Sequence, residues 1–309
     1  MAWIRRILAV VGIAVVVWCC ATAWPAIVHG HPAYAVLLAL TLIVAGVVLW
    51  RAWSPRPRWR GWRFAVAIAL CVAAVAWFAL MVWLKPFSAQ EPALSAMQSS
   101  PTVSVEESAT QIVMTPTTPT GTTGVFFQPG AKVEARAYAA VLRPLAEAGY
   151  TVVIPKQPLG IGFLATGAFE SAQADFPDIT DWVVGGHSLG GTVAAIDAEA
   201  HDSDATAPVT GLLLYGSYPA TDMSTSLTSR VLSLYGTNDG LATPEDIQAS
   251  KAKLPANSFF TPIEGGVHSF FGDYGEQPGD GTPTITHDEA RQLISRNTLV
   301  FLAGLGRGA

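Results

Sequence analysis

The sequence predicts an α/β fold, with a mostly parallel sheet flanked by helices, preceded by three transmembrane helices. Residues 1–84 contain three long apolar runs and no acidic residue, whereas all 23 acidic residues of the 309-residue chain follow Leu84. From residue 124 onward, apolar runs of strand length alternate with stretches of helical periodicity. Buried strands that alternate with helices are typical of a parallel sheet that is covered on both faces.

The N-terminal part, residues 1–84, is predicted to anchor the chain in a membrane. Its apolar runs cover about residues 7–26, 34–50 and 64–84, and none of them contains a charged residue. About 20 apolar residues in a helix cross the ~30 Å hydrocarbon core, and lipid requires that the backbone satisfy its own hydrogen bonds. Nine of the ten tryptophans lie in this part, several at the ends of the runs, where interfacial aromatic residues gather.

Basic residues predict the orientation of these spans. Arg5 and Arg6 precede the first run, and residues 51–63, between the second and third runs, include five arginines. Because loops rich in Lys and Arg stay in the cytoplasm, the part after Leu84 is expected on the extracytoplasmic side of the cell membrane. A second interpretation makes the first run a cleaved signal peptide with its site at residues 21–23, which leaves two spans and the same final side.

The remainder of the chain is acidic, with 11 basic against 23 acidic residues. This balance argues against a nucleic-acid partner, because phosphate binding needs a basic face. All three cysteines lie in the apolar runs, so the acidic part has neither a disulfide nor a thiolate metal site. His29 and His31 have no further metal-ligating residue nearby, and we interpret them as interfacial residues. Neither a metal nor an organic cofactor is expected.

Residues 85–100 are interpreted as a linker, and residues 101–309 as one domain. Residues 102–107 and 111–115 alternate polar and apolar side chains, as in an antiparallel pair at a sheet edge. The Thr- and Pro-rich residues 115–123 then predict a hairpin connection. The further strands are predicted at 125–128, 150–154, 182–186, 209–215, 231–235 and 258–263, and the helices at 133–148, 162–174, 189–200, 244–254 and 287–305.

Residues 186–190 read Gly-His-Ser-Leu-Gly and lie between an apolar strand and a helix. This is the context in which a Gly-x-Ser-x-Gly sequence forms a nucleophile turn. The turn strains the backbone of Ser188, and glycines two residues away on either side avoid a clash. The helix that follows presents unpaired N–H groups, so we predict Ser188 as the nucleophile and the N–H of Leu189 as a donor to the oxyanion.

A serine hydroxyl becomes a good nucleophile when a base takes its proton, and here the base should come last in chain order. His268 follows the last predicted strand, within IEGGVHSFFGDYG, and is the predicted base. His201 follows the nucleophile helix too closely, and His287 begins the final helix.

The acid that orients the base should lie in the loop after the preceding strand. Asp239 stands there, in an Asn-Asp-Gly turn within LYGTNDGLATPE, and is the predicted acid. Asp222, after the earlier strand, is the alternative, whereas Asp246 lies inside a predicted helix. An aspartate before glycine is also ordinary turn chemistry.

The second oxyanion donor is expected in the loop after the first core strand. Pro129 has no N–H, so we predict the backbone of Ala131, with Lys132 or Gly130 as alternatives. Aromatic side chains near the predicted site are candidates for an apolar substrate pocket, although aromatics in such positions are as often core residues. These candidates are Phe163, Phe270, Phe271 and Tyr274.

Four segments together carry a family resemblance: residues 125–158, GGHSLGG, LYGTNDGLATPE and GGVHSFFGDYG. From about Thr102 to the end, the chain resembles the bacterial α/β-hydrolase family that is grouped with dienelactone-hydrolase-like proteins. The resemblance implies the α/β-hydrolase fold and a Ser-Asp-His triad, carried here by Ser188, Asp239 and His268. True dienelactone hydrolases use a cysteine nucleophile, so the serine of this chain does not imply their substrate.

These features together predict a membrane-anchored hydrolase of small-molecule or lipid carboxylic esters that works through an acyl-enzyme. An acyltransferase that acts on cell-envelope components would use the same triad. A non-catalytic binding protein on the same fold is a third reading, but a complete triad argues against it. The spans contain no charged residue of the kind that marks a transport pathway.

Overall fold

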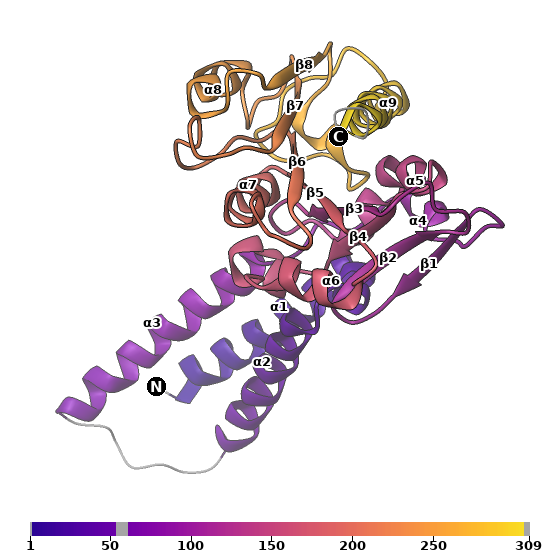
Figure 1. Ribbon diagram of the computed structural model, residues 1–309. Helices are drawn as coiled ribbons and strands as arrows, with labels where there is room; N and C mark the ends of the chain where they lie inside the picture. Colours follow the sequence, from indigo (N-terminus) through magenta and orange to yellow (C-terminus); the bar gives the residue numbers. More distant parts are fainter. Residues whose placement is uncertain (1, 54–60, 306–309) are drawn as a thin grey trace. The chain divides into compact units, whose positions relative to one another are not determined.

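The computed structural model describes residues 2–53 and 61–305 of the chain. Its residues form two compact units, Met1–Pro86 and Phe87–Ala309 (Figure 1).

The first unit consists of three long helices, α1 (Ala2–His29), α2 (Pro32–Arg51) and α3 (Trp62–Trp83). All three are long and apolar enough to cross a membrane. Their large apolar side chains are mostly exposed, as lipid-facing surfaces require, with Val44 and Val72 at 59% and 63%. The helix α1 kinks at Ala23, two residues before a proline that cannot donate a helical hydrogen bond.

Hydrogen bonds between side chains and neighbouring helices hold this unit together. Tyr34 on α2 donates its hydroxyl to the carbonyl of Met81 on α3 at 2.7 Å. The indole N–H of Trp77 on α3 donates to the hydroxyl of Thr41 on α2 at 2.9 Å. Bonds of this kind stabilise helix pairs in lipid, where water offers no competing partner.

The second unit is built on an eight-stranded sheet with the order β1-β2-β4-β3-β5-β6-β7-β8. The pairs β1–β2 and β2–β4 are antiparallel, and all other neighbours are parallel. The predicted fold class is thereby confirmed. The strands are β1 (Val103–Glu107), β2 (Gln111–Pro116), β3 (Thr123–Gln128), β4 (Thr151–Pro155), β5 (Asp181–His187), β6 (Val209–Tyr215), β7 (Arg230–Gly236) and β8 (Phe259–Ile263).

Helices cover both faces of this sheet (Figure 1). Successive residues of a strand point to opposite faces, so Phe127 packs with α5 and α9 while Phe126 packs with α6 and α7. Both rings are fully buried. The helices are α4 (Ala93–Ala96), α5 (Ala139–Glu147), α6 (Ala168–Asp175), α7 (Leu189–His201), α8 (Pro244–Ser250) and α9 (His287–Leu305). Short 3-10 turns are η1 (Ala135–Tyr138), η2 (Pro158–Gly160), η3 (Gly162–Leu164), η4 (Lys251–Lys253) and η5 (His268–Phe271).

The connection between β2 and β3 differs from its prediction. It is not a hairpin, because β4 lies between these two strands and pairs with both. The antiparallel pair β1–β2 is instead attached to the sheet through β4, which the chain reaches only after β3 and α5.

Two further segments differ from expectation. The helix predicted at 133–148 begins only at Ala135, because Val133 forms a β-bridge with Phe87 and Glu134 is extended. Residues 87–97, within the stretch interpreted as a linker, pack on the second unit, and Ala93 is fully buried in its core.

Candidate active site

The predicted nucleophile lies on a strained turn between β5 and α7. Ser188 has φ +52° and ψ −126°, a left-handed conformation that is costly for a residue with a side chain. Two hydrogen bonds hold it there: the Ser188 N–H donates to the carbonyl of Tyr215 at 3.0 Å, and the hydroxyl of Ser217 donates to the Ser188 carbonyl at 2.6 Å. Ser188 is partly exposed.

The two glycines of the motif allow the backbone to pack closely around this turn. A Cβ on Gly186 would overlap the backbone of Gly190. A Cβ on Gly190 would overlap the carbonyl of Gln128, the last residue of β3, and that of Pro129, which follows it. The start of α7 therefore touches the loop after β3, and this loop contains the second predicted oxyanion donor.

The predicted acid and base form a buried hydrogen bond. His268, at the start of η5 after β8, donates from Nδ1 to Oδ2 of Asp239, in the loop after β7, at 2.8 Å. The two side chains are 2% and 0% exposed. The other carboxylate oxygen, Oδ1, accepts the N–H groups of Leu241 and Ala242, each at 2.8 Å. With Nδ1 committed as a donor, the neutral imidazole keeps its lone pair on Nε2.

The loop after β6 joins this pair to the nucleophile turn. A Cβ on Gly216 would lie 3.2 Å from both Asp239 Oδ2 and His268 Nδ1, and its neighbours in the chain make the two hydrogen bonds that hold Ser188. The ring of His187, next to the serine, is centred 4.5 Å from the ring of His268. Within the described residues the Ser188 hydroxyl makes no hydrogen bond to His268, so only the acid and base are directly bonded.

Both predicted oxyanion donors keep an unused backbone N–H. In the loop after β3, Gly130 N–H donates to the Tyr138 hydroxyl at 2.8 Å, and Lys132 N–H donates to the carbonyl of Gly160 at 2.6 Å. Among the hydrogen bonds of residues 2–53 and 61–305, none uses the N–H of Ala131 or that of Leu189. Of the three candidates in this loop, Ala131 is thus the one with an available donor.

A buried tyrosine supports this loop, and no sequence signal pointed to it. Tyr138 of η1 accepts the Gly130 N–H and lies 2.8 Å from Nδ1 of His187, to which its hydroxyl can donate. Burial raises the pKa of Tyr138, and it lowers the pKa of His187 well below the usual value. A protonated phenol therefore faces a neutral imidazole. The contact depends on the 3-10 turn that brings residue 138 back over residue 130.

Asp280 holds the loop of the predicted base. Its carboxylate accepts the backbone N–H groups of His268 at 3.0 Å and Ser269 at 2.8 Å. Although partial burial opposes it, hydrogen bonds from Ser269, His268 and Gly281 hold the pKa of Asp280 below its usual value. Asp273, in the same segment of the chain, is only 2% exposed and pairs with Arg291 at 2.8 Å.

The alternative acids and bases serve other parts of the structure. Asp222 is exposed and binds Ser224, and Asp246 closes the capping box of α8. His201 pairs with Asp204 at 2.8 Å at the end of α7, and His287 begins α9. Within residues 2–53 and 61–305, no group of three or more His, Cys, Asp or Glu side chains could hold a metal ion.

The four pocket candidates differ in exposure. Phe271 and Tyr274 are 1% and 3% exposed and belong to the core, where both rings lie within about 6 Å of His187. Phe270 is partly buried and stacks on His287 at 4.5 Å. Phe163, in η3, is 46% exposed and is the most accessible of the four.

A nucleophile-type turn at the carboxyl ends of parallel strands, with a buried Asp–His pair beside it, is the arrangement found in hydrolases of the α/β class. The sequence pattern of the alpha/beta hydrolase family matches residues 124–292, more than half of the chain. The chain therefore belongs to the alpha/beta hydrolase family, which confirms the family predicted from its motifs. No sequence among the curated proteins matches it.

Solved structures share this fold at low sequence identity. A membrane phospholipase A, described as a bacterial virulence factor, has a TM-score of 0.50 at 14% identity, covering 81% of this chain and 100% of its own. A proposed dienelactone hydrolase from Klebsiella pneumoniae has 0.47 at 13%, covering 65% and 98%. Esterase 2 of Thermogutta terrifontis has 0.47 at 16%, covering 68% and 97%. At these identities the likeness concerns the fold alone.

Proposed function

We propose that this protein is a membrane-anchored serine hydrolase that cleaves carboxylic esters outside the cytoplasm, with Ser188, His268 and Asp239 as its triad. The buried 2.8 Å hydrogen bond between His268 and Asp239 carries the proposal, because it lies beside a serine held at positive φ. An Asp–His bond that fixes the tautomer, next to a strained serine, is the arrangement that nucleophilic acyl transfer needs.

In this reaction the Ser188 hydroxyl attacks the ester carbonyl while Nε2 of His268 takes its proton. The negative charge that develops on the carbonyl oxygen is stabilised by the N–H groups of Leu189 and Ala131. The imidazolium, stabilised by Asp239, then gives its proton to the departing alcohol as the ester C–O bond breaks. Water attacks the acyl-enzyme, His268 takes a proton from it, and the carboxylic acid leaves as Ser188 regains its hydrogen.

The test uses the full chain in detergent, a fluorophosphonate probe and p-nitrophenyl butyrate. We expect the parent to be labelled and to hydrolyse the ester, and Ser188→Ala to lose both properties. The matched control is Ser203→Ala, an exposed serine after α7, which should behave like the parent. Labelling of Ser188→Ala at the parent level would show that another residue is the nucleophile.

A series of substrates addresses the ester class. p-Nitrophenyl esters from acetate to palmitate, together with a phospholipid, compare small and lipid esters under one assay. Added alcohol acceptors would distinguish hydrolysis from acyl transfer, because a transferase forms the new ester in preference to the free acid. We expect the free acid as the main product.

The membrane orientation is tested by cysteine labelling. The proposal is supported by Arg5 and Arg6 near the start of α1, by the five arginines of residues 51–63 and by the three apolar helices. Ala256→Cys, at an exposed position in the second unit, should react with a membrane-impermeant maleimide on intact cells. Trp53→Cys, which follows α2 and replaces a side chain that is 73% exposed, should react only after lysis. The reverse pattern would place the second unit in the cytoplasm.

A further inference from the structure

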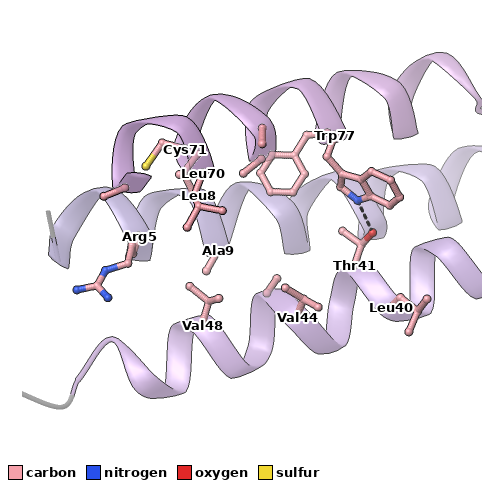
Figure 2. Close-up of a pocket in the computed structure, with 15 residues that line it drawn as sticks. Arg5, Leu8, Ala9, Leu40, Thr41, Val44, Val48, Leu70, Cys71 and Trp77 are labelled. Carbon is pink, nitrogen blue, oxygen red and sulfur yellow. Dashed lines mark hydrogen bonds between the residues drawn. The ribbon is translucent and has the colours of Figure 1, made fainter. Parts of the chain in front are cut away.

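A cavity of about 510 Å³ lies among the three helices of the first unit (Figure 2). Every helix contributes to its wall, so it is a feature of the bundle and not of one helix surface. The wall includes Leu8 and Ala9 of α1, Leu40 and Val44 of α2, and Leu70 and Ala74 of α3.

The wall of this cavity is mostly hydrocarbon, apart from the thiol of Cys71 and the guanidinium of Arg5. Its two polar members in the middle of the bundle, Thr41 and Trp77, satisfy each other at 2.9 Å, and the Thr41 hydroxyl also donates to the carbonyl of Leu37 at 2.7 Å. Burying a polar ligand here without hydrogen-bond partners would be strongly unfavourable. The occupant is therefore apolar over most of its length.

The cavity has room for an extended alkyl chain. Wall residues on α2 run from Leu40 to Val48, which corresponds to ~12 Å of helix rise. A volume of about 510 Å³ along that length is enough for one such chain.

One end of the cavity is strongly basic. Figure 2 shows Arg5 at this end and Trp77 and Leu40 toward the other. Arg6 donates to the carbonyl of Ala52 at 3.1 Å, so the start of α1 and the end of α2, with Arg51, lie together. Residues 1–86 contain no acidic residue, so their formal charge is positive. Arginines at the end of a span reach the interface and favour anionic lipid.

We propose that this cavity binds one acyl chain of a membrane lipid whose anionic headgroup lies against the Arg5–Arg6 end. The lipid fills a space that would otherwise leave its wall without dispersion contacts. The proposal rests on the proposed insertion of α1, α2 and α3 in a membrane, and it is independent of the triad.

Native mass spectrometry of the full chain in detergent tests it, with phosphatidylglycerol and phosphatidylcholine of identical acyl chains as probes. We expect one phosphatidylglycerol to stay bound and phosphatidylcholine to bind at least tenfold more weakly. Ala74→Phe fills the cavity and should lower phosphatidylglycerol binding at least tenfold. Ala79→Phe, on the exposed side of α3, is the matched control and should bind like the parent. Arg5→Gln should remove the preference between the two lipids without removing binding.

Equal binding by Ala74→Phe and the parent would overturn the acyl-chain site, and equal binding of both lipids by the parent would overturn the headgroup assignment. Carbonate extraction of membranes separates these failures from a failure of the anchor. A chain that stays in the membrane pellet but shows either result is inserted without this lipid site, whereas release into the supernatant contradicts insertion itself.

Discussion

Tyr138 and His187 share a hydrogen bond of 2.8 Å directly behind the nucleophile turn. The same hydroxyl accepts the N–H of Gly130, the residue before the predicted oxyanion donor Ala131. One buried tyrosine thus connects the loop after β3 to the residue that precedes Ser188. His187 also packs against the ring of His268, so contacts through Tyr138 and His187 connect the oxyanion loop, the turn of Ser188 and the predicted base.

Tyr138→Phe should lower kcat about tenfold and leave KM little changed, because the Ala131 N–H loses its support while substrate contacts remain. It also leaves the buried Gly130 N–H without a partner, at ~1–3 kcal/mol of stability. The measurement is kcat per site titrated with the fluorophosphonate, which removes any effect of misfolded protein. Tyr150→Phe, at a partly buried tyrosine before β4, is the control. An unchanged kcat per titrated site would limit Tyr138 to a structural role.

Asp239→Asn should reduce kcat by about 10⁴. The amide oxygen would stay where Oδ1 accepts the N–H groups of Leu241 and Ala242, so the amide nitrogen would take the place of Oδ2. It would donate to Nδ1 of His268, which would then hold its own proton on Nε2 and could not act as the base. Asp222→Asn, at the exposed alternative acid, should retain the parent rate. If the two variants exchange these outcomes, Asp222 is the acid and the bond between Asp239 and His268 is structural.

Asp280→Asn should lower kcat/KM about 10-fold to 100-fold, since the amide cannot accept from His268 N–H and Ser269 N–H on both of its terminal atoms. The base would then be held less firmly while its side chain is unaltered. Glu276→Gln, an exposed carboxylate in the same loop, is the control. Steady-state kinetics with p-nitrophenyl butyrate measure both, and parent-like kinetics of the Asp280 variant would contradict the positioning role.

Stability should depend on pH through Asp197 of α7, where burial raises the pKa to about 6. In the unfolded chain this carboxyl has its ordinary pKa near 4, so between about pH 4 and 6 the folded state keeps a proton that the unfolded state loses. Stability therefore falls as the pH rises through this window and stays low above it. Asp197→Asn removes the penalty and should add about 1–3 kcal/mol at pH 8 but almost nothing at pH 4.

Thermal unfolding of the detergent-solubilised chain at the two pH values measures this difference. Asp178→Asn, at an exposed aspartate before β5, should show no such pH-dependent gain. A gain for Asp197→Asn that is equal at pH 4 and pH 8 would mean that the carboxylate charge is not the cause.

The sheet and its helices were predictable because most of the strands are short apolar runs between turn residues, and β1 and β2 alternate polar and apolar side chains. The ranges for β6 and α9 agree with their predictions at both ends. The hairpin expected after β2 was wrong, since strand order depends on pairing between segments far apart in sequence, and β4 comes after β3 in the chain. Periodicity within a segment contains no information about such pairing.

The candidate site was predictable only where the order of strands and loops limits which residues can act as acid and base. Asp239 and His268 were placed in successive loops, and the structure joins them by a hydrogen bond; their catalytic roles stay predictions. Tyr138 and Asp280 were missed because their contacts arise from a 3-10 turn and an irregular loop. No sequence pattern around either residue indicates the contacts that it makes in the fold.

The candidate catalytic residues follow both central strands and an edge strand of the sheet. Ser188 and the predicted oxyanion donors follow β5 and β3, whereas His268 follows β8, one of the two edge strands, whose residues are mostly at least partly exposed. Outermost strands open at lower free energy than central ones. We therefore expect that warming abolishes activity, because His268 is displaced, at a temperature at which the central strands remain folded. Such heat inactivation would reverse on cooling.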